Sequence, residues 1–407
     1  MSIETAAATL AHHITDLKYI EMYVKSTVDG IAAAAIMSIA LSRVNIRFKL
    51  KILSDISIDD IKNPKISLIC DFDLSSISFD DEKVMILDHH TPNTQSIYQI
   101  NPCMFGENGY MDISSAGCAY LVATEMDNTN RDLASLVMLG IIGDNQRISG
   151  YNQKIVQDAT ENNLIHQIKR ILLVGRSVPE MLNQSLHPYL PGISGNNDKS
   201  TELSKECIDQ SSNDLNTASL LSKLVAESSI PYKSIWNIYG DSWDLSNNEV
   251  ISNVHEFVTL IDSCIKFGQN GIAYALCCGD TKFVDEAWEY TSKYRTNMVS
   301  ILKTAKQIRY NPDIWSIENV DVIDDVVDIL RDLTDKPIFV IYHDNEWLQV
   351  SASVQQQDTT LDLKQILNTI VETCGGSCSG FKYHANAKIP LEHENKFFEC
   401  LSKSICT

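Results

Sequence analysis

The first half of the chain alternates short apolar runs with amphipathic stretches. The apolar run 20–24 predicts a strand, and the alanine-rich run 31–41 predicts a helix. Two more short apolar runs, 66–70 and 84–87, each end directly before an aspartate. Strands that alternate with helices predict an α/β domain with a mostly parallel sheet.

Aspartates follow, or lie close after, four of these apolar stretches. They are Asp29, Asp71, Asp88 and Asp144, the last of which comes after the apolar run 133–142. In open α/β sheets, polar residues just past the strand ends line the active crevice. We therefore expect these four carboxylates to share one crevice.

A polar region separates the two halves of the chain. Ser, Asn, Asp and Gly dominate residues 191–217, which predicts a linker or a surface excursion. Beyond it, residues 254–278 are again apolar and predict ordered structure. Residues 338–342 and 347–350, after Pro337, predict a hairpin in a smaller C-terminal α/β domain.

Residues 321–333 carry apolar side chains at helical spacing and four aspartates between them. We interpret these aspartates as a solvated face, with a partner-binding face as the alternative. They are Asp324, Asp325, Asp328 and Asp332.

Length, charge and cysteine content limit the domain organisation and the classes of function that we expect. With 407 residues the chain is too long for one ordinary domain, and we expect a first domain at 1–190, a connecting segment at 191–250 and a second domain at 251–407. The formal net charge of −20 argues against avid nucleic-acid binding, although a local basic groove is compatible with it.

Eleven scattered cysteines and the lack of a signal peptide predict reduced thiols in a cytoplasmic protein. No apolar run is long enough to predict a membrane span.

The most specific chemical feature is Asp88-His89-His90, which directly follows an apolar strand. Two imidazoles beside a carboxylate at a strand end suit a divalent-metal and phosphate site, whereas the alternative is a hydrogen-bonded turn. Asp71-Phe72-Asp73, Asp29-Gly30 and the stretch 140–144 (Gly-Ile-Ile-Gly-Asp) favour the metal site, because clusters rich in carboxylate with one or two histidines suit Mn²⁺ or Mg²⁺.

This order of motifs resembles the DHH phosphoesterase superfamily, and more closely the archaeal RecJ-like proteins. Further segments match that family's signatures in the same order, from the N-P and I-S-x-A-G motifs to the DHHA1 region. They are 100–102 (Ile-Asn-Pro), 105–106 (Phe-Gly), 113–117 (Ile-Ser-Ser-Ala-Gly), 188–195 (Pro-Tyr-Leu-Pro-Gly-Ile-Ser-Gly), 255–279 and 375–376 (Gly-Gly). The resemblance covers nearly the whole chain and implies an N-terminal DHH domain facing a C-terminal DHHA1 domain across a cleft.

The chain departs from the family in its first motif. Active members carry H-x-D-x-D-G, whereas Lys25 and Thr27 stand here at the histidine and first aspartate positions. The resemblance implies that those two positions help hold one of two metals, with Asp71 bridging. The ligands of the other metal are all present, namely Asp29, Asp71, His89 and Asp144. Lys25 either places its ammonium near the lost metal position or points into solvent.

The C-terminal motif departs as well. The family's G-G-G-H-x-x-A-A-G aligns with residues 378–386, so Phe381 stands at the histidine position, and Gly380 remains with Gly375 and Gly376 as a degenerate substrate-binding set. His384 lies three residues further on. A displacement of one turn argues against its taking over the role of the lost histidine.

Two lesions in two domains predict an inactive or impaired enzyme that holds one Mn²⁺ or Mg²⁺, or none. Asp88, His89 and His90 are then the catalytic remnant. The resemblance implies a replication scaffold bound to the GINS complex and the MCM helicase, like the catalytically silent eukaryotic factor that joins them, with single-stranded DNA as a weak partner. The alternatives are a Mn²⁺-dependent single-strand exonuclease or small phosphoester hydrolase of reduced activity, and a nucleotide-sensing domain.

Overall fold

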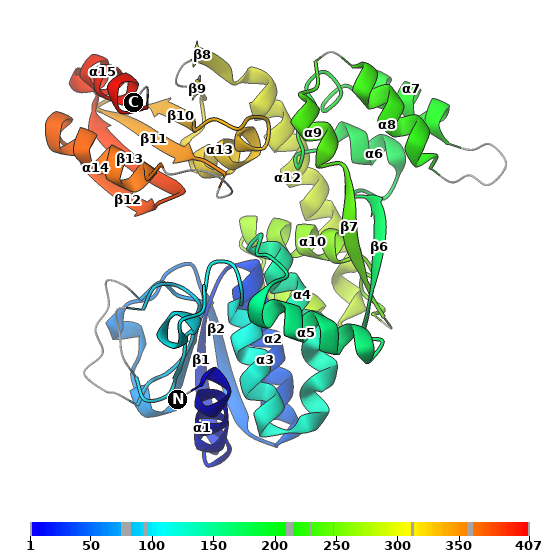
Figure 1. Ribbon diagram of the computed structural model, residues 1–407, viewed down its shortest axis with the longest axis vertical. Helices are drawn as coiled ribbons and strands as arrows, with labels where there is room; N and C mark the ends of the chain where they lie inside the picture. The colour runs from blue at the N-terminus through cyan, green and yellow to red at the C-terminus, as the bar shows by residue number, and fades with distance from the viewer. Residues whose placement is uncertain are drawn as a thin grey trace. The chain divides into compact units, whose positions relative to one another are not determined.

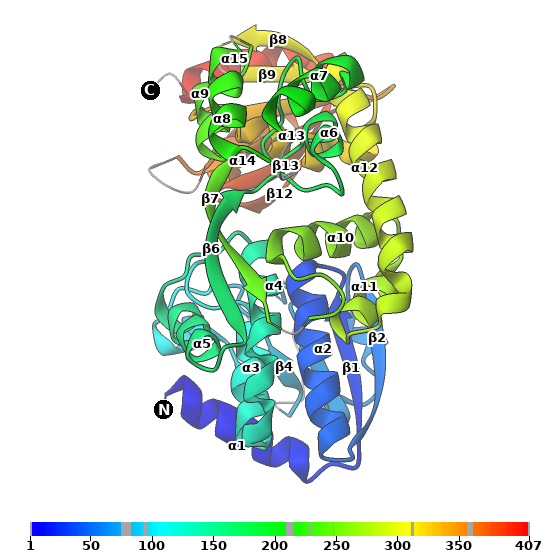
Figure 2. The same ribbon diagram turned by 90° about the vertical axis from the view of Figure 1, so that its right-hand side faces the viewer.

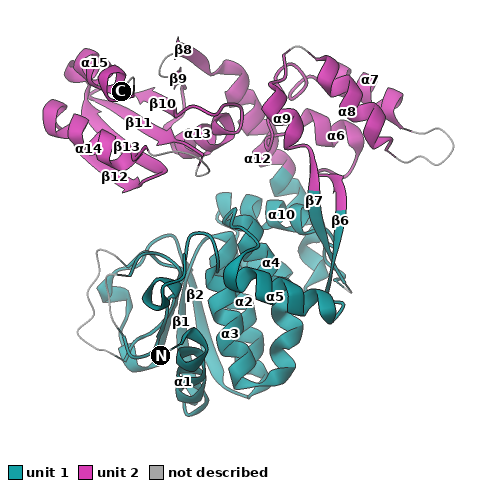
Figure 3. Cartoon of the chain, in the orientation of Figure 1, with its two compact units in different colours: residues 1–168, 241–291 teal, residues 169–240, 292–407 magenta. Residues whose placement is uncertain are grey.

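The computed structural model describes residues 2–74, 83–92, 96–208, 215–227, 229–246, 248–310, 313–355 and 361–405. The chain divides into two compact units, which Figure 3 shows in separate colours. Unit 1 comprises residues 1–168 and 241–291, and unit 2 comprises residues 169–240 and 292–407. These bounds differ from the expected 190 and 250, because the chain enters unit 2 earlier and returns to unit 1 before leaving it again.

Unit 1 is built on a five-stranded parallel sheet with strand order β2-β1-β3-β4-β5. The strands are β1 (Tyr19–Lys25), β2 (Arg47–Leu53), β3 (Ser67–Cys70), β4 (Met85–Leu87) and β5 (Gln99–Ile100). The helices are α1 (Ile3–Thr15), α2 (Val28–Arg43), α3 (Ser115–Met126), α4 (Ala134–Gly143), α5 (Gly150–Glu161), α10 (Val254–Lys266) and α11 (Asn270–Cys277).

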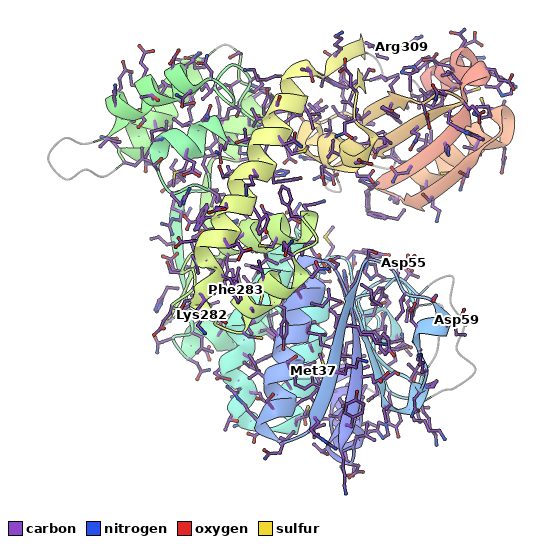
Figure 4. All side chains as sticks on the ribbon, turned by 180° about the vertical axis from the view of Figure 1, so that it is seen from behind. Met37, Asp55, Asp59, Lys282, Phe283 and Arg309 are labelled. Carbon is purple, nitrogen blue, oxygen red and sulfur yellow. The ribbon has the colours of Figure 1, made fainter. Side chains whose placement is uncertain are left out.

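The alanine-rich helix α2 lies at the centre of unit 1 (Figures 1 and 2). It packs on β1 and β2 and also contacts α3, α4 and α11. It is apolar on every side, as a helix surrounded by other elements requires, and Met37, labelled in Figure 4, is fully buried. The side chain of Thr27 caps α2 by accepting a hydrogen bond from the Gly30 amide at 3.0 Å, so the helix begins directly after the end of β1.

The predicted linker is folded where it is described. The two-stranded sheet of β6 (Ile165–Ile171) and β7 (Tyr239–Leu245) contains the points where the chain enters and leaves the first part of unit 2. Between these strands in sequence lies a helical cluster. Its helices are α6 (Val178–Asn183), α7 (Asn197–Cys207), α8 (Thr217–Ala226) and α9 (Tyr232–Trp236). Asn196 and Asn216 cap α7 and α8, and Leu203, Leu220 and Leu224 enter a shared core. The polar residues that predicted a linker therefore include helix caps, while residues 209–214 lie outside the described residues.

The rest of unit 2 is built on a six-stranded mixed sheet of order β12-β13-β11-β10-β9-β8. Its strands are β8 (Lys306–Tyr310), β9 (Asp313–Ser316), β10 (Ile338–His343), β11 (Trp347–Ser353), β12 (Ser377–Phe381) and β13 (His384–Pro390). Its helices are α13 (Ile323–Arg331), α14 (Leu363–Cys374) and α15 (Glu394–Ile405), together with α12 (Val284–Thr304), which begins in unit 1 and enters unit 2 at residue 292.

Side chains alternate across this sheet and separate two cores. Phe339 and Ile341 of β10 pack with residues of α14 and α15, whereas Ile338 and Val340 pack with residues of α12 and α13. The predicted hairpin is confirmed, because β10 and β11 pair in antiparallel register. The predicted fold class, a mostly parallel α/β domain followed by a second α/β domain, is also confirmed. Among the described helices, none has the length and apolar character needed to cross a bilayer.

Candidate metal centre

Four of the predicted ligands converge at the carboxyl end of the unit 1 sheet. Asp71 directly follows β3, His89 comes two residues after β4, Asp29 lies in the first turn of α2, and Asp144 is the C-cap of α4. One ligand atom from each of the four lies within 4.8 Å of the others. The structure therefore brings together the complete set Asp29, Asp71, His89 and Asp144 that the motifs predicted.

The imidazole of His89 is oriented by a backbone carbonyl. Its Nδ1 lies 2.8 Å from the Gly109 oxygen, and because a carbonyl only accepts, Nδ1 carries the hydrogen. Nε2 then faces the carboxylates, at 3.1 Å from Asp144 Oδ2, 3.4 Å from Asp71 Oδ1 and 3.9 Å from Asp29 Oδ2. An outer hydrogen bond that fixes the tautomer in this way is typical of metal-ligating histidines.

Asp29 is held by the start of a helix. Its carboxylate is fully buried and accepts hydrogen bonds from the amides of Ser115 at 2.6 Å and Ala116 at 2.9 Å, both in the first turn of α3. The partial positive charge at this helix N-terminus favours the carboxylate there. The I-S-S-A-G motif, quoted from the sequence without a role, thus positions a predicted ligand.

Asp71 receives hydrogen bonds on both oxygens. The Ser115 hydroxyl donates to Oδ1 at 2.8 Å, and the Thr27 hydroxyl donates to Oδ2. Burial alone raises the pKa of Asp71. The hydrogen bond and charge of His89, the charge of His90 and the hydrogen bond from Thr27 outweigh burial and lower the pKa to about 2. The Asp71 carboxylate is therefore ionised and fixed in orientation.

The charges of this cluster are unbalanced without a cation. Burial, together with the charges of Asp144 and Asp71, raises the pKa of Asp29 well above its usual range. Burial lowers the pKa of His89, but hydrogen bonds to Asp144 and Asp71 outweigh it and leave the pKa well above its usual range. Both shifts arise because buried carboxylates have too little positive charge nearby. Three carboxylate ligands and one imidazole nitrogen fit Mn²⁺ or Mg²⁺, since both prefer oxygen ligands and Mn²⁺ also accepts imidazole.

The remaining residues of the DHH motif lie beside this set. His90 Nδ1 is 2.7 Å from Asp88 Oδ1, and Asp88 is itself buried. Asp71, His89 and His90 form a second group of potential ligand atoms within 4.8 Å of one another. Asp88 therefore orients His90, and the structure places the tripeptide beside the candidate ligand set.

The two altered positions of the first motif differ in their contacts. Thr27 contacts the predicted bridging ligand Asp71 directly through its hydroxyl. Lys25 is half-buried at the end of β1, and its ammonium forms no ion pair with any described residue. The expectation that Lys25 places a charge near the lost metal position therefore gains no support from its contacts.

The predicted substrate-binding glycines lie in unit 2 and form a separate group. Gly375 ends α14, while Gly376 and Gly380 flank or belong to β12. A Cβ at Gly376 would lie 1.9 Å from the Lys388 carbonyl oxygen, so this glycine is needed for the pairing of β12 with β13. This structural reason for Gly376 is independent of any role in substrate binding.

His384 does not lie one turn away from Phe381, and that part of the prediction is wrong. Phe381 ends β12, His384 begins β13, and the two are directly paired across a two-residue turn with ring centroids 6.2 Å apart. Directly paired residues point to the same face of a sheet. The three-residue spacing thus marks a hairpin and places His384 beside the position of the lost histidine.

Both ring nitrogens of His384 are already engaged. Nε2 lies 3.2 Å from Asp324 Oδ1, and Nδ1 lies 3.4 Å from Asp328 Oδ1. Ser351 and Ser353 donate hydrogen bonds to the same two carboxylates, at 2.6 and 3.0 Å. Asp324 and Asp328 therefore contact the sheet, although their side chains stay 54% and 38% exposed. Asp332, which caps α13, is only 20% exposed and lies 3.1 Å from His187 Nδ1, so the predicted solvated face is partly engaged in internal contacts.

Sequence reasoning missed the residues that support the ligands. Gln146 donates to the Gly109 carbonyl at 3.0 Å and accepts from Asn152 at 2.8 Å, so it holds the oxygen that orients His89. Ser115 connects Asp29 with Asp71. Ser115 lies in a recognised motif, whereas no sequence signal pointed to Gln146.

Comparison with known proteins gives one relative and several similar structures, and no family model matches the chain. An uncharacterized protein of Methanocaldococcus jannaschii is 23% identical over 412 residues, which cover 95% of this chain and 93% of that protein. CDC45 from Entamoeba histolytica has a TM-score of 0.65 at 12% identity, covering 100% of this chain and 99% of CDC45. RecJ from Thermus thermophilus, solved with Mn²⁺, has a TM-score of 0.61 at 14% identity, covering 99% of this chain and 54% of RecJ. The chain has a RecJ-like DHH fold.

The resemblance drawn from the motifs is thereby confirmed for the fold, which this chain shares with an exonuclease RecJ bound to manganese and with CDC45. This RecJ-like chain spans about half the length of the Thermus protein. That protein was crystallised with Mn²⁺ and also with Mg²⁺, two ions that the Asp and His cluster of this chain suits.

Proposed function

We propose that this RecJ-like protein binds one divalent cation, lacks two-cation nuclease chemistry, and acts as a scaffold in a replicative helicase assembly. The observation that carries the proposal is the hydrogen bond from the Thr27 hydroxyl to Asp71. Thr27 stands where the resemblance places a metal-binding carboxylate. Its hydroxyl occupies an oxygen of Asp71, the ligand that would have to bridge two cations.

The cation is Mn²⁺ or Mg²⁺, held by Asp29, Asp71, His89 and Asp144. When bound, such an ion lowers the pKa of a coordinated water and neutralises phosphate charge. Loss of the second cation costs several kcal/mol of transition-state stabilisation, which corresponds to roughly three decades in rate. Phe381, at the substrate-side position of unit 2, supplies no imidazole in place of the lost one.

The proposed partners are the GINS complex and the MCM helicase. The likeness in fold to CDC45 supports this part of the proposal, together with the resemblance drawn from the motifs. The net charge of −20 favours protein partners over the phosphate backbone of DNA. Single-stranded DNA is at most a weak ligand on this view.

Metal stoichiometry and nuclease activity test the catalytic part together. Crystals grown with Mn²⁺ should show one ion by anomalous scattering, and labelled single-stranded DNA, RNA and dinucleotides should stay intact in Mn²⁺. Two ions side by side, together with product release that Asp71→Asn abolishes, would refute the proposal. That result would favour the exonuclease or small phosphoester hydrolase, which the intact four-ligand set also allows.

The scaffold is tested separately with purified GINS and MCM from the same organism. We expect a complex that survives gel filtration at physiological salt, both for the wild type and for Asp71→Asn. A complex that depends on Asp71 would connect assembly to the cation. If neither GINS nor MCM binds, the scaffold is excluded whatever the metal content.

A further inference from the structure

The short helix α9 of unit 2 presents its largest side chains to solvent. Tyr232 and Trp236 are 69% and 79% exposed. Between them Ser234 is fully buried, and Ile235 packs against the core that α7 and α8 share. One side of α9 therefore faces the core, whereas the side with the two aromatic rings has no such packing.

The two rings belong to one face of the helix. Tyr232 and Trp236 are four residues apart, which places their side chains next to each other along a helix. α9 lies beside α8 (Figures 1 and 2), and Val225 in the last turn of α8 is 63% exposed. Large exposed apolar side chains that lie together mark interaction sites, and Trp and Tyr are the residues enriched at the centres of such sites.

The structure holds α9 in a fixed position. Lys233 donates hydrogen bonds to the Thr334 carbonyl at 2.7 Å and to the Asp335 carboxylate. The Tyr232 hydroxyl donates to the same carboxylate at 3.4 Å. These contacts attach α9 to the segment between α13 and β10, so a partner would meet aromatic side chains that are already positioned.

The charge beside the two rings is negative on its outer side. The side chain of Asp335 is 71% exposed, whereas that of its partner Lys233 is 14% exposed. The hydrogen bond and charge of Lys233 lower the pKa of Asp335, so the carboxylate is ionised at neutral pH. A Lys or Arg side chain complements this carboxylate, and the exposed faces of Trp and Tyr rings also attract a cation.

Charge disfavours two other occupants of this surface. Nucleic-acid bases can stack on exposed aromatic rings, but their phosphates require available cations. The lysine of α8 is paired with Glu206, and that of α9 with Asp335. A second copy of this chain, which has a net charge of −20, would bring two acidic surfaces together. A positively charged segment of a different protein is therefore the occupant that the surface favours.

We propose that Tyr232 and Trp236 form a docking surface for a basic amphipathic helix of a protein partner. Two side chains four residues apart make a ridge that fits between the apolar side chains of a facing helix. The apolar face of the partner helix covers the two rings, and a Lys or Arg beside that face pairs with Asp335. The surface lies within unit 2 and does not require the cation of unit 1.

Fluorescence anisotropy with the full chain and a labelled amphipathic helical peptide of leucine and lysine tests the proposal. A peptide with glutamate in place of lysine should bind at least about tenfold more weakly. Trp236→Ala should weaken binding of the lysine peptide at least about tenfold, and Asp335→Asn about threefold. Ile97→Ala, which removes a 56% exposed apolar side chain of unit 1, is the matched control and should leave binding unchanged.

Thermal melts show whether Trp236→Ala stays folded, as we expect for so exposed a residue. Fluorine NMR of the chain labelled with fluorotryptophan then locates the contact. The chain has five tryptophans, and Trp236→Phe identifies the resonance of Trp236. We expect the lysine peptide to shift this resonance.

Three results with the peptides would overturn the proposal: no binding of the lysine peptide, equal binding of both peptides, or equal binding by the wild type and Trp236→Ala. Labelled single-stranded DNA that binds through Trp236, while the lysine peptide does not bind, would assign the surface to nucleic acid instead. Self-association that Trp236→Ala abolishes in sedimentation equilibrium would assign the surface to a second copy of the chain.

Discussion

Replacing His384 with glutamine removes a positive charge that the structure places between two carboxylates. The ring nitrogens lie 3.2 Å from Asp324 Oδ1 and 3.4 Å from Asp328 Oδ1. Burial alone lowers the pKa of His384, but hydrogen bonds to Asp324 and Asp328 and their charges raise it, to about 9. The imidazolium form therefore links α13 to β13 at neutral pH.

The size and sign of the effect follow from this pKa. A rise from 6.5 to about 9 corresponds to about 3 kcal/mol, and because the Asp324 and Asp328 side chains are 54% and 38% exposed, we expect about 1–2 kcal/mol after screening. The folded state binds the proton more tightly than the unfolded state. The stabilisation is therefore complete below about pH 6.5 and is lost as the pH rises through 9.

Two measurements check this reasoning. The His384 ring proton should titrate by NMR near pH 9, and the difference in unfolding free energy between the wild type and His384→Gln should shrink between pH 7 and pH 10. Taking the difference removes the contribution of lysines, tyrosines and cysteines that titrate in the same range. A His384 pKa near its ordinary value, or a difference independent of pH, would refute the ion cluster.

Three further predictions concern the metal centre and the folded state. Mn²⁺ at a hundred times its dissociation constant should stabilise unit 1 by about 2.7 kcal/mol, which raises the melting temperature by about 5–10 °C. Thermal melts with Mn²⁺ and with EDTA measure this shift, and Asp29→Asn should remove most of it. The double variant Lys25→His, Thr27→Asp should bind a second Mn²⁺, counted by anomalous scattering, and should cleave labelled single strands at least about a hundredfold faster than the wild type. A single bound ion and no gain in cleavage would show that other altered positions limit the activity. Gly376→Ala should lower the free energy of unfolding, measured in urea, by at least about 2 kcal/mol, and Gly268→Ala by about 1 kcal/mol. Both glycines have a positive φ, but of the two only Gly376 lacks room for a Cβ.

The convergence of the four candidate ligands was predictable in part because it depends on short-range sequence patterns. Asp71 and Asp88 each follow a fully buried strand, and parallel strands bring such positions to one edge of the sheet. His89 was predictable from the same strand end. Asp144 follows a helix and not a strand, so only the ordered motifs connected it to the others.

The supporting contacts depend on approaches that spacing does not encode. Gln146 reaches the Gly109 carbonyl across 37 residues. Phe381 and His384 are three residues apart, a spacing shared by a helical turn and by a two-residue hairpin, and only the pairing of β12 with β13 decides between them. Likewise, the asparagines of the predicted linker indicate a loop in the sequence, whereas in the structure Asn196 and Asn216 cap α7 and α8.

One altered position, Thr27, and the neighbour of another, His384, form internal contacts. Thr27 is compatible with the cap of α2 and at the same time satisfies an oxygen of Asp71. His384, beside Phe381, is neutralised by carboxylates from α13. In both places, polar groups are bonded internally. Interactions of this kind stabilise a site at the expense of its chemistry, because strained or unsatisfied groups are what an active site provides to its substrate. The proposed scaffold role, which requires no turnover of phosphoesters, is compatible with polar groups that are bonded internally in this way.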